Sequence, residues 1–192
     1  MKTSDIAGAI LSEIERQQEG TAPFLLAVDG RCAAGKSTLA RELAQRSGCT
    51  VIPMDHFFLR PEQRTEARFA EPGGNVDRER FLTDVLRPLR AGEPFSYRPF
   101  DCHTLSLAAP VPVVPAKLCV VEGSYSCHPA LRDAYDLTVF LDVSPNEQLR
   151  RIRVRNGEEG AQRFAARWIP LEERYFTELD VRAHCGLYYL SE

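Results

Sequence analysis

The most constraining feature of this sequence is one short segment between two runs of different periodicity. Residues 30 to 37 read Gly-Arg-Cys-Ala-Ala-Gly-Lys-Ser, which fits the pattern of a Gly, four residues, then Gly-Lys-Ser at each fixed position. The apolar run Phe24 to Val28 precedes it and predicts a buried strand, whereas Lys36 to Arg46 predicts a helix. A strand, a glycine loop and a helix in that order predict a phosphate-binding loop.

Each residue type in this loop has a physical reason to be there. Gly30 and Gly35 permit backbone angles that other residues resist, so consecutive N–H groups can face phosphate oxygens at the start of a helix. Lys36 is expected to reach the β and γ phosphates, and Ser37 to bind Mg²⁺. The loop therefore predicts binding of ATP or GTP with Mg²⁺, and the alternative is a strand-to-helix turn that binds nothing. The residues expected to contact the nucleotide are Gly30, Arg31, Cys32, Ala33, Ala34, Gly35, Lys36, Ser37 and Thr38.

The same alternation of strand and helix continues along the chain and predicts an α/β fold. Strands separated by helices imply right-handed crossovers and a mostly parallel sheet between two helix layers, the three-layer arrangement of P-loop NTPases. With 192 residues, we expect one domain over residues 1 to 192. Besides the elements around the loop, we predict helices over 4–20, 78–89 and 145–153, and strands over 50–53, 118–121 and 137–143.

Composition excludes several classes of protein. The formal net charge is −3, which argues against general affinity for nucleic acid or an anionic membrane. No apolar run reaches the roughly 20 residues of a membrane-spanning helix, and the N-terminal segment lacks the apolar core of a secretory signal. The six cysteines are scattered without metal-ligand spacing. We therefore expect a cytoplasmic protein with reduced thiols.

Acidic residues follow three of the predicted strands, at the edge of a parallel sheet where ligands bind. Glu122 ends the strand 118–121 and is the candidate that supports Mg²⁺; Asp142 is a weaker rival. Asp55 follows the strand 50–53 and precedes His56-Phe57-Phe58. Such a carboxylate can accept the proton of a substrate hydroxyl during phosphoryl transfer. The plainer alternatives are a solvated strand-end acid for Glu122 and a loop acid for Asp55.

Four segments in this order resemble the uridine kinase-like P-loop kinases: the phosphate loop, Asp55 with its aromatic neighbours, Gly74-Asn75-Val76-Asp77, and Val121-Glu122-Gly123. The likeness spans roughly residues 24 to 155. The resemblance implies ATP as phosphoryl donor, a small-molecule acceptor, and Asp55 as the base toward its hydroxyl. It also implies an acceptor pocket that includes Phe58, Asp77 for sugar hydroxyls, and Tyr97 and His103 for a nucleobase.

Four arginines resemble the start of that family's lid, which we place at about residues 150 to 165. On a helix, Arg151 and Arg155 share one face and Arg150 and Arg153 another. We expect Arg151 and Arg155 to act on the phosphates; the alternative is a solvated basic face. The aromatic-rich segment 168–176 is expected to pack in the core, and the alternative is stacking on a purine.

The leading hypothesis is an ATP-dependent kinase acting on a hydroxyl of a nucleoside or a similar polar metabolite. One alternative is a nucleotide-binding or regulatory protein without metabolite kinase activity, and another is a homologue that only binds nucleotide. The chain lacks both an Asn-Lys-x-Asp segment and an Asp-x-x-Gly after the second acidic strand, which argues against a GTPase switch. The sequence leaves the acceptor and the oligomeric state open.

Overall fold

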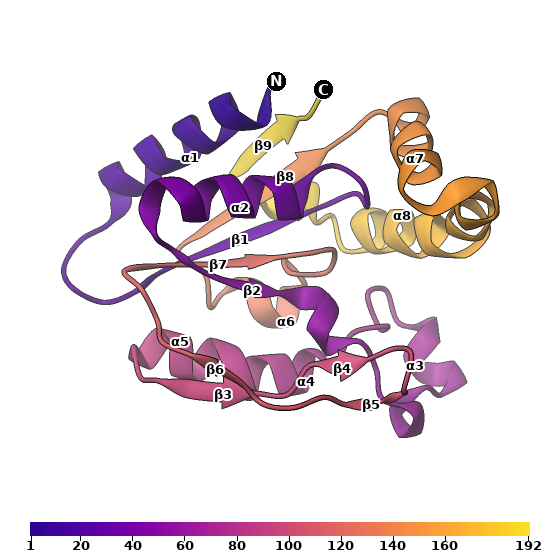
Figure 1. The fold of residues 1–192 in the computed structure, drawn as a ribbon, viewed down its shortest axis with the longest axis horizontal. Coiled ribbons are helices and arrows are strands. Elements are labelled where there is room, and N and C mark those ends of the chain that lie inside the picture. Colours follow the sequence, from indigo (N-terminus) through magenta and orange to yellow (C-terminus); the bar gives the residue numbers. More distant parts are fainter.

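A computed structural model describes all residues from 1 to 192. Its centre is one parallel sheet of five strands in the order β2-β7-β1-β8-β9 (Figure 1). The strand bounds are β1 Phe24–Gly30, β2 Thr50–Pro53, β7 Leu118–Glu122, β8 Leu137–Asp142 and β9 Leu187–Leu190. The predicted α/β fold with a parallel sheet is confirmed.

Helices cover both faces of the sheet, which makes three layers (Figure 1). On β1, Leu26 and Val28 pack toward α1 and α2, while Leu25 and Ala27 pack into the opposite cluster with Phe81. Burial on both faces explains why this strand is a continuous apolar run. The helices are α1 Thr3–Gln17, α2 Lys36–Ser47, α3 Glu66–Ala70, α4 Arg78–Phe81, α5 Arg87–Ala91, α6 Pro129–Arg132, α7 Pro145–Arg163 and α8 Ile169–Glu178.

The register of the sheet brings the acidic strand ends to one edge. Val28 of β1 lies beside Glu122 of β7, and Pro53 of β2 lies on the other side of the same glutamate. Gly30 pairs with Leu141, one residue before Asp142. The phosphate loop and the predicted acids therefore start from adjacent strands.

The helix predicted over 78–89 forms without a gap, but its hydrogen-bonding pattern changes in the middle. Between α4 and α5, residues Leu82–Leu86 form a π-helical turn, and a second π-helical turn, Phe164–Trp168, joins α7 to α8. Each turn lies just before a proline, Pro88 or Pro170. Proline has no N–H and its ring clashes with the carbonyl four residues earlier, which widens the preceding turn.

The chain contains strands for which we predicted no element. β9 extends the sheet beyond β8. Two short antiparallel pairs lie outside the main sheet: β3 Phe95–Tyr97 with β6 Val111–Val113, and β4 Phe100–Asp101 with β5 Ser106–Leu107. α7 also continues past the predicted end at Arg153, with a break at Gly157, whose φ of 73° and ψ of 178° are not helical.

All six cysteines are free in the structure. None of the helices combines the length and the apolar character needed to cross a bilayer.

Candidate active site at the phosphate loop

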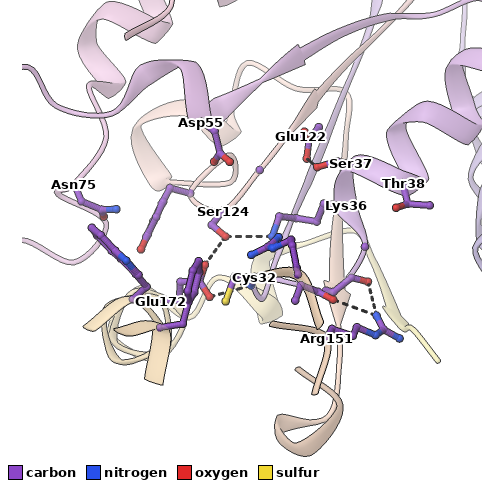
Figure 2. Close-up of a pocket in the computed structure, with 18 of the residues that line it drawn as sticks. Cys32, Lys36, Ser37, Thr38, Asp55, Asn75, Glu122, Ser124, Arg151 and Glu172 are labelled. Atoms are coloured by element: carbon purple, nitrogen blue, oxygen red, sulfur yellow. Dashed lines mark hydrogen bonds between the residues drawn. The ribbon is translucent and has the colours of Figure 1, made fainter. Parts of the chain in front are cut away.

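A cavity of about 1000 Å³ opens at the carboxyl edge of the sheet. The phosphate loop and the start of α2 form one wall, the segments after β2 and β7 form a second, and α7 with α8 forms a third (Figure 2). Most of the predicted nucleotide contacts line it, from Cys32 to Thr38; Gly30 and Arg31 do not. Arg31 instead pairs with Asp142 at 2.9 Å and Glu173 at 2.8 Å.

Gly30 is required by the fold of the loop. Its φ is +129°, and a Cβ at this position would lie 1.9 Å from the carbonyl oxygen of Leu141 on the adjacent strand. Any side chain would therefore push β1 and β8 apart or distort the turn into the loop. The first glycine of the motif serves close packing, and the residues from Cys32 onward line the cavity.

Lys36 is folded back against its own loop. Its ammonium group donates to the carbonyl oxygens of Gly30 at 2.7 Å and Arg31 at 2.9 Å, and to Ser124 Oγ at 3.1 Å. The side chain is buried, yet each of its three protons has an acceptor. Lys36 therefore remains next to the loop where a phosphate would bind.

Glu172 of α8 reaches the same place from the opposite wall (Figure 2). One carboxylate oxygen accepts the backbone N–H of Cys32 at 2.9 Å, and the other accepts the Ser124 hydroxyl at 2.7 Å. Burial and the neighbouring Glu172 raise the pKa of the Cys32 thiol to about 12, so this cysteine is a neutral thiol at physiological pH.

The core-packing prediction for 168–176 is correct for Tyr175 and Phe176, which are buried, but it overlooked Glu172. A signal was present in the sequence. Glu172 precedes Tyr175 and Phe176 by three and four residues, the spacing that places helical side chains on one face. An acid on the buried face of a helix needs hydrogen-bond donors, and here the phosphate loop and Ser124 supply them.

Ser37, at the start of α2, and Glu122, at the end of β7, place two oxygen atoms that could act as metal ligands next to each other. The Ser37 hydroxyl donates to Glu122 at 3.2 Å. Burial raises the pKa of Glu122, an effect that the charge of Lys36 opposes and that of Asp55 reinforces. No group of three metal-binding side chains occurs in the chain. A hydroxyl and one carboxylate suit Mg²⁺, which keeps waters and phosphate oxygens in most of its coordination shell.

Asp55 lines the cavity from the single helical turn Met54–Phe57 that follows β2. It is exposed, and Figure 2 shows its carboxylate beyond Ser124, across the cavity from the phosphate loop. Phe58, the other predicted acceptor contact nearby, also lines this wall. The structure therefore brings Asp55, Lys36, Ser37 and Glu122 to one cavity.

Three of the predicted acceptor contacts do not line the cavity: Asp77, Tyr97 and His103. Asp77 caps α4 by accepting the N–H of Arg80 at 3.2 Å, and its side chain is only 2% exposed. The buried Tyr97 shares a hydrogen bond of 2.9 Å with His56. His103 lies exposed in the turn after β4.

Only part of the expected division among the α7 arginines is seen, because Arg150, placed on the other face with Arg153, also lines the cavity. Arg151 and Arg155 line the cavity together with Arg150, whereas Arg153 does not and pairs with Glu158 at 3.0 Å. Arg151 pairs with Glu147 at 2.8 Å and donates to the carbonyl oxygens of Ala33 at 3.1 Å and Ala34 at 3.4 Å. It therefore connects α7 directly to the phosphate loop.

Comparison with known proteins agrees with this geometry. No family model matches the chain. It is 27% identical over 154 residues to a uridine kinase of Leuconostoc citreum, covering 73% of this chain and 72% of that protein. It is 26% identical to a uridine kinase of Chlamydia pneumoniae, covering 71% of this chain and 65% of that protein.

Among solved structures, a possible uridine kinase from Bacillus stearothermophilus has the same fold, with a TM-score of 0.71 at 19% identity over 97% of this chain and 96% of that one. A D-glycerate 3-kinase from Cryptococcus neoformans has a TM-score of 0.61 at 16% identity, covering 89% of this chain and 87% of that one.

A phosphate loop at the carboxyl edge of a five-stranded parallel sheet places the protein in the P-loop class of nucleotide-binding folds. Within that class, the resemblance to the uridine kinase-like P-loop kinases that the motifs predicted is confirmed. The relatives support a small-molecule kinase that transfers a phosphoryl group.

Proposed function

We propose that this protein is an ATP-dependent kinase that transfers the γ-phosphoryl group to a hydroxyl of a nucleoside or a similar polar metabolite. The observation that carries the proposal is the convergence in one cavity of a complete phosphate loop, the Ser37–Glu122 pair and the Asp55 carboxylate. Phosphoryl transfer needs positioning and charge stabilisation more than covalent chemistry from the protein. This set of residues provides both.

On the donor side, the backbone N–H groups of the loop and the Lys36 ammonium bind the β and γ phosphates. Ser37 and Glu122 hold Mg²⁺, which when bound offsets the phosphate charge. Arg151 and Arg155 add guanidinium groups from the lid, which we place at about residues 150 to 165 of a single domain spanning residues 1 to 192. Guanidinium groups match phosphate oxygens in charge and in hydrogen-bond geometry.

On the acceptor side, Asp55 orients the attacking hydroxyl and accepts its proton. The hydroxyl oxygen forms a bond to the γ phosphorus, the bond from that phosphorus to the bridging oxygen breaks, and ADP leaves with the bonding electrons. The proton stays on Asp55 until it passes to solvent. This assignment makes Asp55 a group that acts in transfer and not in nucleotide binding.

The test is Asp55→Asn, which preserves size and removes the proton acceptor. We expect single-turnover phosphoryl transfer to fall roughly 10²–10⁴-fold, the usual contribution of a positioned acid or base, while ATP affinity by isothermal titration stays unchanged. Asp133→Asn is the matched control, because the Asp133 side chain is 97% exposed and lies outside the cavity.

Two results would contradict the assignment of Asp55. A large loss of ATP affinity in Asp55→Asn would place this residue in the Mg²⁺ shell, and an unchanged transfer rate would make it a loop acid. ATP binding without a phosphorylated product from any acceptor would favour a nucleotide-binding or regulatory protein.

A further inference from the structure

The acceptor half of the cavity contains one arginine whose charge no acid of the protein balances. Four arginines between residues 60 and 80 form ion pairs with carboxylates, namely Arg60, Arg68, Arg78 and Arg80. Arg64 has no carboxylate within 4.0 Å, and it is the one arginine of this stretch that lines the cavity. The charge of Arg64 is therefore available to a ligand.

Arg64 is exposed, and two contacts orient its guanidinium group. Its Nε donates to the carbonyl oxygen of Leu59 at 3.0 Å, and its guanidinium carbon lies 5.4 Å from the centre of the Phe100 ring. A guanidinium group has five N–H donors, so a single hydrogen bond leaves both terminal amino groups free. A guanidinium held at its Nε by one bond and on its face by a ring is preorganised for an anion.

Arg64 lies in the same part of the cavity as Asp55. Cys102 also lines this wall. Burial raises the pKa of its thiol, the charge of Arg64 lowers it, and the charge of Asp55 raises it. The wall therefore carries a carboxylate that can accept a proton and, near it, a cation that can bind an anion. Phe58 and Phe69 give this part of the cavity its apolar surface.

The three residues that the resemblance assigns to nucleoside recognition do not line the cavity, although the neighbouring Asn75 does. Asp77, expected to hold sugar hydroxyls, lies 3.4 Å from Arg80 and 3.6 Å from Arg60 and does not reach the cavity. Tyr97 and His103, expected to contact a nucleobase, do not line it either. Arg64 therefore adds recognition by charge to a wall that also offers the Asn75 amide.

We propose that the acceptor is a small hydroxylated compound with its own carboxylate or phosphate group, which Arg64 binds while Asp55 receives the hydroxyl proton. This inference rests on the proposed kinase function and names the class of its acceptor. Carboxylate and phosphate share the chemistry that a guanidinium recognises, a planar or tetrahedral set of anionic oxygens.

The experiment compares acceptors in matched pairs, with ATP and Mg²⁺ and with product mass as the readout. The carboxylate pair is glycerate and glycerol, the phosphate pair is ribose 5-phosphate and ribose, and uridine represents an uncharged nucleoside. We expect the charged member of at least one pair to have a kcat/KM roughly 10- to 100-fold above its neutral partner, the range of a hydrogen-bonded charge pair. The pair that shows the difference identifies the anionic group.

Variants of Arg64 connect this preference to the residue. With the charged acceptor, Arg64→Gln should raise the acceptor KM roughly 10- to 100-fold and leave the KM for ATP unchanged, and Arg64→Lys should recover part of the loss because it restores the charge. Arg41→Gln is the control, since Arg41 is exposed on α2, forms no ion pair and lies outside the cavity.

The outcomes separate this inference from the proposed function. Equal turnover of charged and neutral acceptors, preference for uridine, or an Arg64→Gln variant with an unchanged acceptor KM would overturn the anionic acceptor and leave the kinase intact. ATP binding with no phosphorylated product from any of the five compounds would overturn the kinase and this inference together.

Discussion

For single residues, the contact between Glu172 and the phosphate loop is the main feature, since its carboxylate accepts the Cys32 N–H. In a phosphate loop, backbone N–H groups of this kind donate to phosphate oxygens. Ser124 links the same carboxylate to Lys36, since the hydroxyl donates to Glu172 and accepts from the ammonium group. A carboxylate of the protein thus lies next to the loop N–H and to the hydroxyl that contacts Lys36.

Glu172→Gln should therefore strengthen ATP binding. The amide keeps an oxygen that can accept the Cys32 N–H but removes a negative charge close to where the phosphates bind, and we expect roughly tenfold tighter affinity by isothermal titration. Glu173→Gln is the neighbouring control, because Glu173 pairs with Arg31 and does not line the cavity. Weaker ATP binding in Glu172→Gln would instead show that the carboxylate supports the loop in its binding conformation.

Lys36→Ala tests the nucleotide site itself. We expect ATP affinity to fall and turnover to be lost, because the ammonium charge would be missing in the ground state and in the transition state. Isothermal titration and a coupled assay for ADP measure the two effects separately. Wild-type affinity together with full activity would remove the nucleotide site from this loop.

At the scale of elements, α7 joins the phosphate loop to the lid. Arg151 reaches the Ala33 and Ala34 carbonyl oxygens, and Arg155 lies with its guanidinium carbon 5.5 Å from the centre of the Phe164 ring. Between Arg155 and Phe164, the helix breaks at Gly157, where a φ of 73° favours glycine. The break separates an anchored first half of α7 from a second half that continues into α8.

Replacing Arg151 and Arg155 together with alanine should lower kcat more than acceptor binding. Guanidinium groups that face the phosphates stabilise charge that spreads during transfer, so we expect a fall in kcat of roughly 10²-fold with a smaller change in the acceptor KM. Arg153→Ala is the control on the same helix, because Arg153 pairs with Glu158 away from the cavity. A double variant as active as this control would identify a solvated basic face.

At the scale of the whole molecule, the buried helix packing makes folding sensitive to acid. His128 precedes α6 and stacks on Tyr175 of α8, with ring centres 6.2 Å apart. Burial, together with the charges of Arg78 and Arg68, lowers the pKa of His128 to about 4, although a hydrogen bond with the Pro72 backbone and the charge of Glu79 oppose the shift. The folded protein therefore holds His128 neutral at a pH where the unfolded chain protonates it.

The sign of the resulting pH dependence follows from proton linkage. Between the unfolded pKa of 6.5 and the folded value of about 4, the unfolded chain binds the extra proton. Above pH 6.5, His128 is neutral in both the folded and the unfolded chain, and it does not reduce the free energy of unfolding. As the pH falls below 6.5, that free energy decreases, and the unfolding equilibrium shifts by up to about tenfold per pH unit.

Denaturant unfolding from pH 4 to pH 7 measures this effect when wild type is compared with His128→Asn. Asparagine retains an acceptor for the Ala130 N–H that His128 caps at 3.1 Å, and it does not titrate. We expect a shallower loss of stability toward acid pH in the variant. Parallel pH profiles for the two proteins would contradict the assignment to His128, since all other titrating groups are shared.

The elements around the cavity show which features the sequence determined by itself. β1, the phosphate loop and α2 were predictable because apolar runs, glycines and helical periodicity act over neighbouring residues. The acids Asp55 and Glu122 were predictable as strand-end residues, because carboxyl ends of parallel strands meet at one edge of a sheet. β9 and the strand pairs between residues 95 and 113 were not predictable, since partners from distant parts of the chain order these short strands.

Only the tertiary structure decided which side chains share the cavity. Asp77, Arg60 and Arg64 lie within one stretch of sequence, yet the first two are paired with each other and Arg64 lines the cavity. Glu172 and Cys32 are separated by 140 residues and meet through one hydrogen bond. Local pattern determines which elements form, because it sets periodicity and backbone freedom. The packing of distant elements determines which charges are compensated by the protein and which remain available to a substrate.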